Sequence, residues 1–163
     1  MSNTVVIRGR LARLVKEKAE KLGFSVDEYV VELLSQGLDP KDRALEYIGA
    51  AKDLLNEAQE ELRKDNIRQA AEKIWGAAAL AVKAYAYWRD GRRLSSHGEL
   101  WEYKRKLEDL FGEWVSDSWN AANTMHICFY EGWCADKDIS TAYKRVEKLV
   151  NELDILLRKK SSS

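Results

Sequence analysis

Residues 67–90, IRQAAEKIWGAAALAVKAYAYWRD, determine the fold class of this 163-residue chain. Apolar side chains recur through the stretch in alternating steps of four and three residues, at Ile67, Ala71, Ile74, Ala78, Ala81, Tyr85 and Trp88. This spacing places them on one face of an α-helix. The many alanines leave room for a second helix to approach closely. The stretch therefore predicts a long central helix of a helical bundle.

Four further helices are predicted around it. Asp39 is a capping residue, and Pro40 follows at the first helical position, so a helix begins there and runs to about Lys64. Similar patterns predict helices over roughly 96–111, 113–133 and 138–159. Short connections favour antiparallel neighbours. We therefore expect an all-α, up-and-down antiparallel bundle of about five helices over residues 39–160, followed by a disordered tail at 161–163.

The N-terminal residues predict a separate small unit. Residues 3–9, NTVVIRG, are rich in β-branched side chains and end in glycine, which is typical of a short strand. A basic amphipathic helix follows and stops at Gly23. Ser25 and Glu28 then form a capping box at the start of a second helix, which ends at Gly37. Residues 1–38 are thus predicted to be a strand-helix-helix appendage.

Charge and cysteine content narrow the function classes. Lysine and arginine total 27, as do aspartate and glutamate, so no overall field favours nucleic acid or anionic lipid. No apolar run of 18 residues and no leader pattern is present, so we expect a cytoplasmic protein with no membrane contact. Cys128 and Cys134 match no zinc-binding spacing and are expected to be reduced thiols.

The helix predicted over 113–133 carries the first candidate site. His126 lies on its apolar seam, with Asn123 and Tyr130 one turn to either side. One interpretation is a buried neutral imidazole that fixes helix packing through a hydrogen bond. The other is a polar pocket or a general acid/base, because histidine titrates near neutral pH. The sequence leaves both open.

Two further groups of residues could bind an anion. Arg92 and His97 lie in and after an arginine-rich loop, where guanidinium groups and free backbone donors at a helix start can hold a phosphate. The alternative is a solvated turn. Trp75 and Lys83 lie on the central helix, where Lys83 either contacts an anion or lays its stem over apolar surface with its ammonium in water.

Several catalytic classes have no motif in this sequence. It contains no phosphate-binding Walker loop, no Gly-x-Ser-x-Gly and no dinucleotide fingerprint. The two histidines, His97 and His126, are not at a helical metal-binding spacing. We therefore expect neither a metal nor a cofactor.

Residues 40–157 resemble the archaeal PaREP family. The resemblance is carried by RQAAEKIWGAAALAVKAYAYWRDGRRLSSHGELWEY at 68–103 and WNAANTMHICFYEGW at 119–133. That family is similar in fold to the HEPN superfamily (higher eukaryotes and prokaryotes nucleotide-binding) of helical bundles, which are often dimeric. Some HEPN members are metal-independent ribonucleases, and others are partners of small nucleotidyltransferases in toxin–antitoxin pairs. The resemblance implies a homodimer, a nucleotide or nucleic-acid ligand and a nucleotidyltransferase-type protein partner.

The resemblance also assigns candidate catalytic residues. Catalytic HEPN ribonucleases carry an arginine shortly before a histidine, and Arg92 to His97 has that spacing. Before His126 the matching place holds Asn120 or Asn123 and no arginine. A cation is needed to stabilise the phosphate transition state. His126, His97 and Arg92 are therefore the catalytic candidates, but the missing arginine favours a non-catalytic protein. The predicted ligand-binding residues are Asn123, His126, Tyr130, Arg92, His97, Trp75 and Lys83.

Residues 3–37 resemble a ribbon-helix-helix unit, in which two chains pair their strands and lay the ribbon in the DNA major groove. The resemblance implies that Thr4, Val6 and Arg8 face one side of the ribbon and that Ser25 meets a phosphate at the start of the second helix. The DNA-binding candidates are Thr4, Arg8, Arg10 and Ser25. Val6 on the same strand offers no hydrogen bond to a base. Strand pairing could then serve dimerisation alone. A DNA-binding regulator is the third candidate function, beside the binding protein and the ribonuclease.

Overall fold

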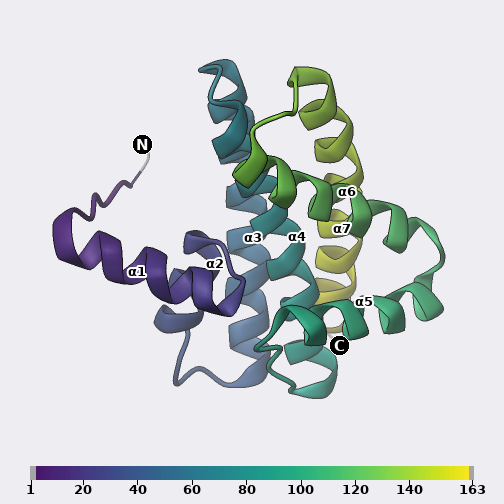
Figure 1. The fold of residues 1–163 in the computed structure, drawn as a ribbon. Coiled ribbons are helices and arrows are strands. Elements are labelled where there is room, and N and C mark those ends of the chain that lie inside the picture. Colours follow the sequence, from purple (N-terminus) through teal and green to yellow (C-terminus); the bar gives the residue numbers. More distant parts are fainter. Residues whose placement is uncertain (1–2, 162–163) are drawn as a thin grey trace.

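The structure, a computed structural model, describes residues 3–161, and all of their regular secondary structure is α-helical (Figure 1). The helices are α1 (Gly9–Leu22), α2 (Val26–Leu34), α3 (Pro40–Arg63), α4 (Ile67–Asp90), α5 (His97–Phe111), α6 (Trp114–Glu131) and α7 (Asp136–Ser161). The predicted all-α class is confirmed. Ser161 of the predicted tail is the last residue of α7, and residues 162–163 lie outside the described part of the chain.

Helix α4 is the centre of the molecule, as its sequence predicts. Every side chain from Ile74 to Tyr87 is buried, because α2, α3, α6 and α7 all pack against α4. Its alanines allow α3 to lie alongside it as an antiparallel neighbour. Asp39 caps α3 by accepting hydrogen bonds from the backbone N–H groups of Lys41 and Asp42, both at 3.0 Å.

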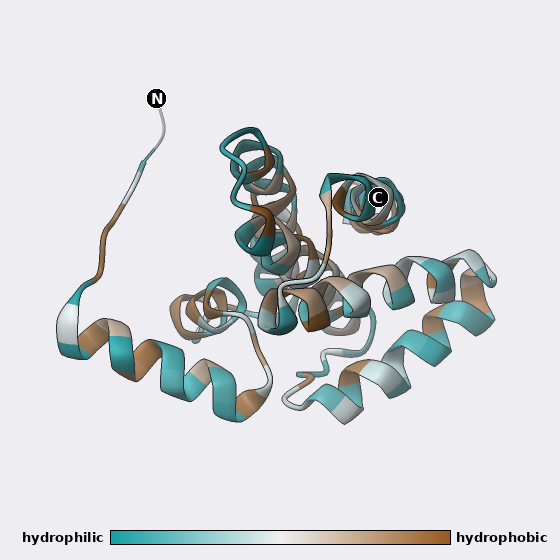
Figure 2. Cartoon of the chain, turned by 45° about the horizontal axis from the view of Figure 1, so that its top comes forward, coloured by the Kyte–Doolittle hydropathy of each residue, from teal (hydrophilic) through white to brown (hydrophobic). Residues whose placement is uncertain are grey.

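Helices α5 and α6 depart from the predicted arrangement. α7 runs alongside α3 and α4, whereas α5 and α6 form a pair that crosses these three helices (Figures 1 and 2). The prediction of a simple up-and-down bundle is therefore wrong, although helices occur at the predicted positions. Trp119 of α6 lies between Trp75 of α4 and Trp101 of α5, with ring centroids 5.1 and 5.9 Å away. We attribute the crossing to these bulky rings, which hold the α5–α6 pair across α4.

The predicted N-terminal strand is absent from the described residues. Residues 3–8 precede α1 without forming a strand, and the side chains of Val5 and Val6 are 87% and 65% exposed. A strand needs a partner for its backbone hydrogen bonds, and a single chain offers none at this position. This segment and α1 project from the bundle as an arm, on which apolar and polar residues alternate (Figure 2).

Helix α2 is fixed to α4 by a buried group of charges. The Lys83 ammonium lies 2.7 Å from Glu28 Oε2 and 3.1 Å from Glu32 Oε1, and 3.3 Å from the centre of the Phe24 ring. The contact with Glu28 Oε2 is an ion pair and not an aligned hydrogen bond. The expectation that this ammonium reaches water is wrong, since Lys83 is 0% exposed. Burial raises the pKa of Glu28, although Lys83 opposes the shift.

The two cysteines are also joined. Cys128 near the end of α6 forms a disulfide with Cys134, their Cα atoms 5.8 Å apart. The expectation of reduced thiols is therefore wrong for this structure. Gly132 adopts a left-handed conformation (φ 73°) after α6, and this turn brings Cys134 back beside the helix end.

Across residues 3–161, no helix combines the length and apolarity that crossing a membrane requires.

Candidate functional site

A part-buried histidine–carboxylate pair joins α6 to α4. His126 Nδ1 lies 3.1 Å from Glu72 Oε2, and the two side chains are 13% and 11% exposed. A carboxylate at this position favours the tautomer in which Nδ1–H donates to it, which leaves Nε2 as the second functional nitrogen. Burial raises the pKa of Glu72, while the hydrogen bond with His126 opposes the rise. The pair therefore combines a carboxyl group of raised pKa with an oriented imidazole.

Aromatic rings enclose this imidazole. Trp75 stacks on His126 at a centroid distance of 4.9 Å and an interplanar angle of 27°. Tyr130, one turn along α6, meets it edge-on at 5.2 Å. His97 lies 5.3 Å from Trp75 and 6.0 Å from His126. Burial, and then the charge of His126, lower the pKa of His97, which favours its neutral form at pH 7.

A groove of about 320 Å³ opens beside the pair, between α1 and α2 on one side and α4 and α6 on the other. It is lined by Lys16, Ala19, Glu20, Phe24, Ser25, Val26, Asp27, Gln69, Glu72, Phe129 and Tyr130. His126 lies directly behind Glu72 and Tyr130, with which it is in contact. The groove thus combines carboxylates and aromatic rings on its walls with Lys16 from the basic helix α1.

Arg68 positions the α6 wall of the groove. This residue in the first turn of α4 donates from Nε to the carbonyl of Phe129 (2.8 Å) and from Nη2 to the carbonyl of Tyr130 (2.6 Å). The last carbonyls of a helix have no partner within the helix. The Arg68 guanidinium supplies one, and it fixes the turn from which Phe129 and Tyr130 project into the groove.

A family model for the archaeal PaREP1/PaREP8 family matches residues 46–150, which is more than half of the chain. The chain belongs to this family. The match includes Glu72, Trp75, His97 and His126, whereas α1 and α2 precede it. No curated protein and no solved structure is similar enough to this PaREP1/PaREP8-family chain to extend the comparison.

Within this PaREP1/PaREP8-family chain, only some of the predicted ligand-binding residues come together. Trp75, His97, His126 and Tyr130 form one cluster. Lys83 does not join it, because its ammonium turns toward α2.

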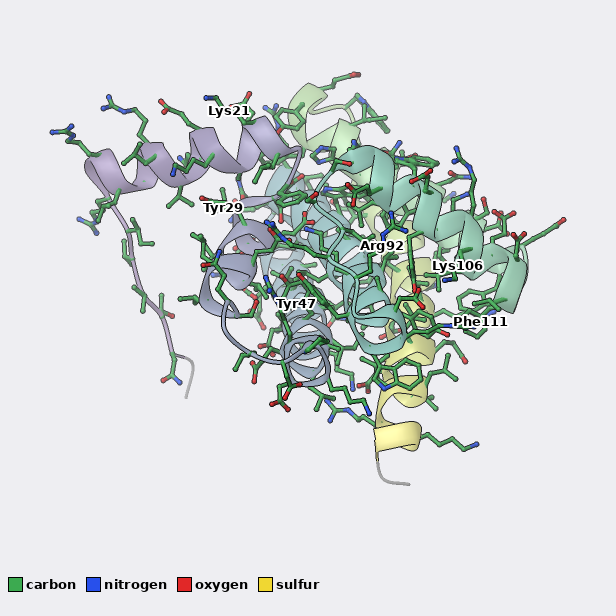
Figure 3. All side chains as sticks on the ribbon, turned by 90° about the horizontal axis from the view of Figure 1, so that it is seen from below. Lys21, Tyr29, Tyr47, Arg92, Lys106 and Phe111 are labelled. Atoms are coloured by element: carbon green, nitrogen blue, oxygen red, sulfur yellow. A yellow bond between two sulfur atoms is a disulfide. The ribbon has the colours of Figure 1, made fainter. Side chains whose placement is uncertain are left out.

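Of the predicted ligand-binding residues, Tyr130 alone lines the groove itself, and Arg92 and Asn123 complete the predicted set. Arg92 is exposed, 3.9 Å from Glu102 (Figure 3). Asn123 is part-buried on α6, one turn before His126.

The predicted DNA-binding residues also lie in two different environments. Thr4, Arg8 and Arg10 are exposed on the N-terminal arm. Ser25 is 2% exposed, and its hydroxyl accepts the backbone N–H of Glu28 at 3.0 Å, which completes the predicted capping box. The start of α2 packs against α4, since a Cβ added to Gly76 would lie 3.0 Å from Ser25 Oγ. Ser25 borders the groove, but its hydroxyl is already engaged with the backbone N–H of Glu28.

Sequence reasoning missed Glu72, Lys16 and Glu20. Glu72 had no clear signal, because Lys73 follows it directly and Arg68 and Gln69 precede it in the polar start of α4. Lys16 and Glu20 had none, since they resemble any solvated pair on a charged helix. Among residues 3–161, no group of three or more histidine, cysteine, aspartate or glutamate side chains is arranged to hold a metal ion.

Proposed function

We propose that this chain is a non-catalytic binding protein that recognises a nucleotide, or the end of a single-stranded nucleic acid, in the groove between α1 and α6. The observation that carries the proposal is the part-buried His126–Glu72 pair, of which Glu72 lines this groove. A buried polar pair of this kind is expensive to maintain unless its atoms are satisfied. A ligand edge that completes its hydrogen bonds gives the pair a role.

The chemistry of the groove suits a nucleobase. A carboxylate such as Glu72 accepts hydrogen bonds from the exocyclic amino group of a base, as carboxylates do for cytosine N4. Tyr130 is 52% exposed and presents an aromatic face on which a base can stack. Phe129 lies edge-on to it at 5.0 Å and supports that ring.

Phosphate contacts fit the rim of the groove and not its walls. Three of the lining side chains, Glu20, Asp27 and Glu72, are carboxylates that repel phosphate. Helix α1 and the residue before it carry six basic side chains against two acidic ones, Arg8, Arg10, Arg13, Lys16, Lys18 and Lys21 against Glu17 and Glu20. A single strand can therefore follow α1 while its terminal base enters beside Lys16.

Binding is tested with fluorescein-labelled oligocytidine RNA by fluorescence anisotropy. Tyr130→Ala should weaken binding by about tenfold or more, since one stacked base contributes about 1–3 kcal/mol. Glu72→Gln should weaken it by a similar factor, since a hydrogen bond to a charged group contributes about 1.5–3 kcal/mol. Arg92→Ala is the matched control, because Arg92 is exposed and does not line the groove. Equal affinities for the wild type and both groove variants would refute the proposal.

A metal-independent ribonuclease is the second candidate, favoured by one observation. Glu72 orients His126 as a carboxylate orients a general base, and His97 lies close to it. No arginine lines the groove to stabilise a phosphate transition state, so we place this function second. Cleavage of a mixed RNA pool in EDTA that disappears in both His126→Ala and His97→Ala would establish it.

The proposal includes a homodimer formed through the N-terminal arm. Val5, Val6 and Ile7 are exposed next to Leu11 and Leu14 of α1, which are 66% and 47% exposed. Burying such a stripe is favourable, and a second copy of the chain presents an identical one. Light scattering should give twice the chain mass, and Val6→Asp with Leu11→Asp should give the monomer.

The DNA-binding alternative predicts instead that duplex binding is lost on deleting residues 1–37.

A further inference from the structure

The disulfide joins the site to the start of α7. Cys128 lies in the last turn of α6, directly before Phe129 and Tyr130, which line the groove. Cys134 lies in the link between α6 and α7, where its backbone N–H donates to Cys128 Sγ at 3.2 Å. The disulfide therefore restrains the last turn of α6 against this link.

Besides the ring contacts of Tyr130 with His126 and Phe129, few other contacts hold this turn. Arg68 donates hydrogen bonds to the carbonyls of Phe129 and Tyr130, and the Gly132 N–H donates to the Cys128 carbonyl at 2.6 Å. Apolar packing of the link is weak, since Trp133 is 50% exposed. Arg68 is itself exposed. A helix end held by exposed hydrogen bonds opens at low free energy, so the covalent bond is the strongest restraint on it.

We propose that the Cys128–Cys134 disulfide is a redox switch of the groove. The oxidised form holds Phe129 and Tyr130 in place for the ligand, and reduction releases the last turn of α6 and weakens binding. This regulation rests on the proposed function, because it acts on the same groove. The release of the turn itself does not depend on any ligand.

A dithiol is the reductant class that completes the chemistry. One thiolate attacks Cys134 Sγ, which is more accessible than Cys128, at 9% exposure against 0%. The S–S bond breaks, a mixed disulfide forms at Cys134, and Cys128 leaves as a thiolate that takes a proton. The second thiol of the reductant then displaces Cys134 and forms the reductant's own disulfide. Two electrons pass to the protein, which ends with two thiols.

The test compares the oxidised protein, the dithiothreitol-reduced protein and Cys128→Ser/Cys134→Ser. Hydrogen exchange of the peptide that covers 126–135 gives a readout that needs no ligand. We expect exchange there to accelerate by about tenfold or more on reduction, the scale expected when a short disulfide loop opens. The affinity for oligocytidine RNA should fall at least threefold in parallel. The double-serine variant should match the reduced protein and should not respond to dithiothreitol.

Each other result has a defined meaning. Unchanged exchange on reduction overturns the switch, whatever the affinity does. Faster exchange with unchanged affinity also overturns it, since the groove would then not depend on this turn. Two titratable thiols in protein purified under air would show that the bond does not form. Faster exchange with no RNA bound by either form refutes the proposed function and leaves the redox-controlled turn standing.

Discussion

Replacing Lys83 with methionine should destabilise the fold far more than an ordinary lysine substitution. Methionine keeps the apolar stem but removes the ammonium between Glu28 and Glu32, whose side chains are 0% and 3% exposed. Arg93 still reaches Glu32 at 3.3 Å, so Glu28 is the carboxylate left without a cationic partner. Breaking one side of a buried ion pair costs about 3–5 kcal/mol. We expect a loss in that range.

Two controls identify the cause of the loss. Lys106→Met removes an ion pair with Asp90 at 2.7 Å, but there the side chains are 45% and 30% exposed, so less than about 1 kcal/mol should be lost. Adding Glu28→Gln to Lys83→Met should recover most of the stability. Glutamine neutralises the stranded charge, and it is also accepted at this position of a capping box.

The pH dependence supplies an independent check. The folded pKa of Glu28 is raised above its ordinary value of 4.5, so this group lowers the free energy of unfolding as pH rises above 4.5. Removing the ammonium raises that pKa further, so the deficit of Lys83→Met should be larger at pH 7.5 than at pH 5. Urea unfolding, followed by tryptophan fluorescence, measures the free energy of unfolding of both proteins at each pH. A loss below about 1 kcal/mol, or one independent of pH, would refute this view of the charge group.

Further perturbations test other parts of the structure. Gly76→Ala should destabilise by about 1–3 kcal/mol, because its Cβ would lie 3.0 Å from both Leu54 Cδ1 and Ser25 Oγ. Gly49→Ala, on α3 with nothing within 4 Å, should instead stabilise by up to about 1 kcal/mol; equal effects in thermal unfolding would contradict the close packing of α2 on α4. The pKa of His97 is lowered below 6.5, so the wild type should lose more stability than His97→Gln when pH falls from 7.5 to 5.5, and parallel urea-unfolding curves would contradict its burial. Cys128→Ser/Cys134→Ser should lose about 2 kcal/mol relative to the oxidised wild type, as a short loop predicts, and an unchanged melting temperature would argue against the bond.

The helices could be predicted from the sequence because their signals are local. Asp39-Pro40 starts α3, the Ser25–Glu28 capping box starts α2, and the apolar repeat of α4 matches its burial. The crossing of α5 and α6 could not be predicted in this way. It depends on how Trp75, Trp101 and Trp119 fit together, and that fit involves three helices.

The site residues were predictable only where they share one helix. His126 and Tyr130 are one turn apart on α6, and their proximity follows from helical spacing. Glu72 meets His126 from 54 residues away, and Glu32 meets Lys83 from 51 residues away. Nothing in the local sequence states which helix faces which. The sequence therefore offered an anion contact or a solvent-reaching ammonium for Lys83, whereas Lys83 is the centre of a buried ion-pair group.

The prediction of an N-terminal strand was wrong for a different reason. The pattern of residues 3–9 satisfies strand propensity, but propensity supplies no partner. In a single chain the segment has none, so these apolar residues stay exposed. Their pattern is consistent with a partner outside the chain, and light scattering on the arm variants tests that directly.

The most direct test of nucleotide binding in the groove is an NMR titration of the ¹⁵N-labelled oxidised protein with cytidine 5′-monophosphate, which carries both an amino-bearing base and a phosphate. We expect shift changes to cluster at the groove, at Lys16, Glu72 and Tyr130 above all, and to disappear in Glu72→Gln. Changes confined to the Arg92–His97 loop or to the N-terminal arm, or no changes at millimolar nucleotide, would contradict the proposed function.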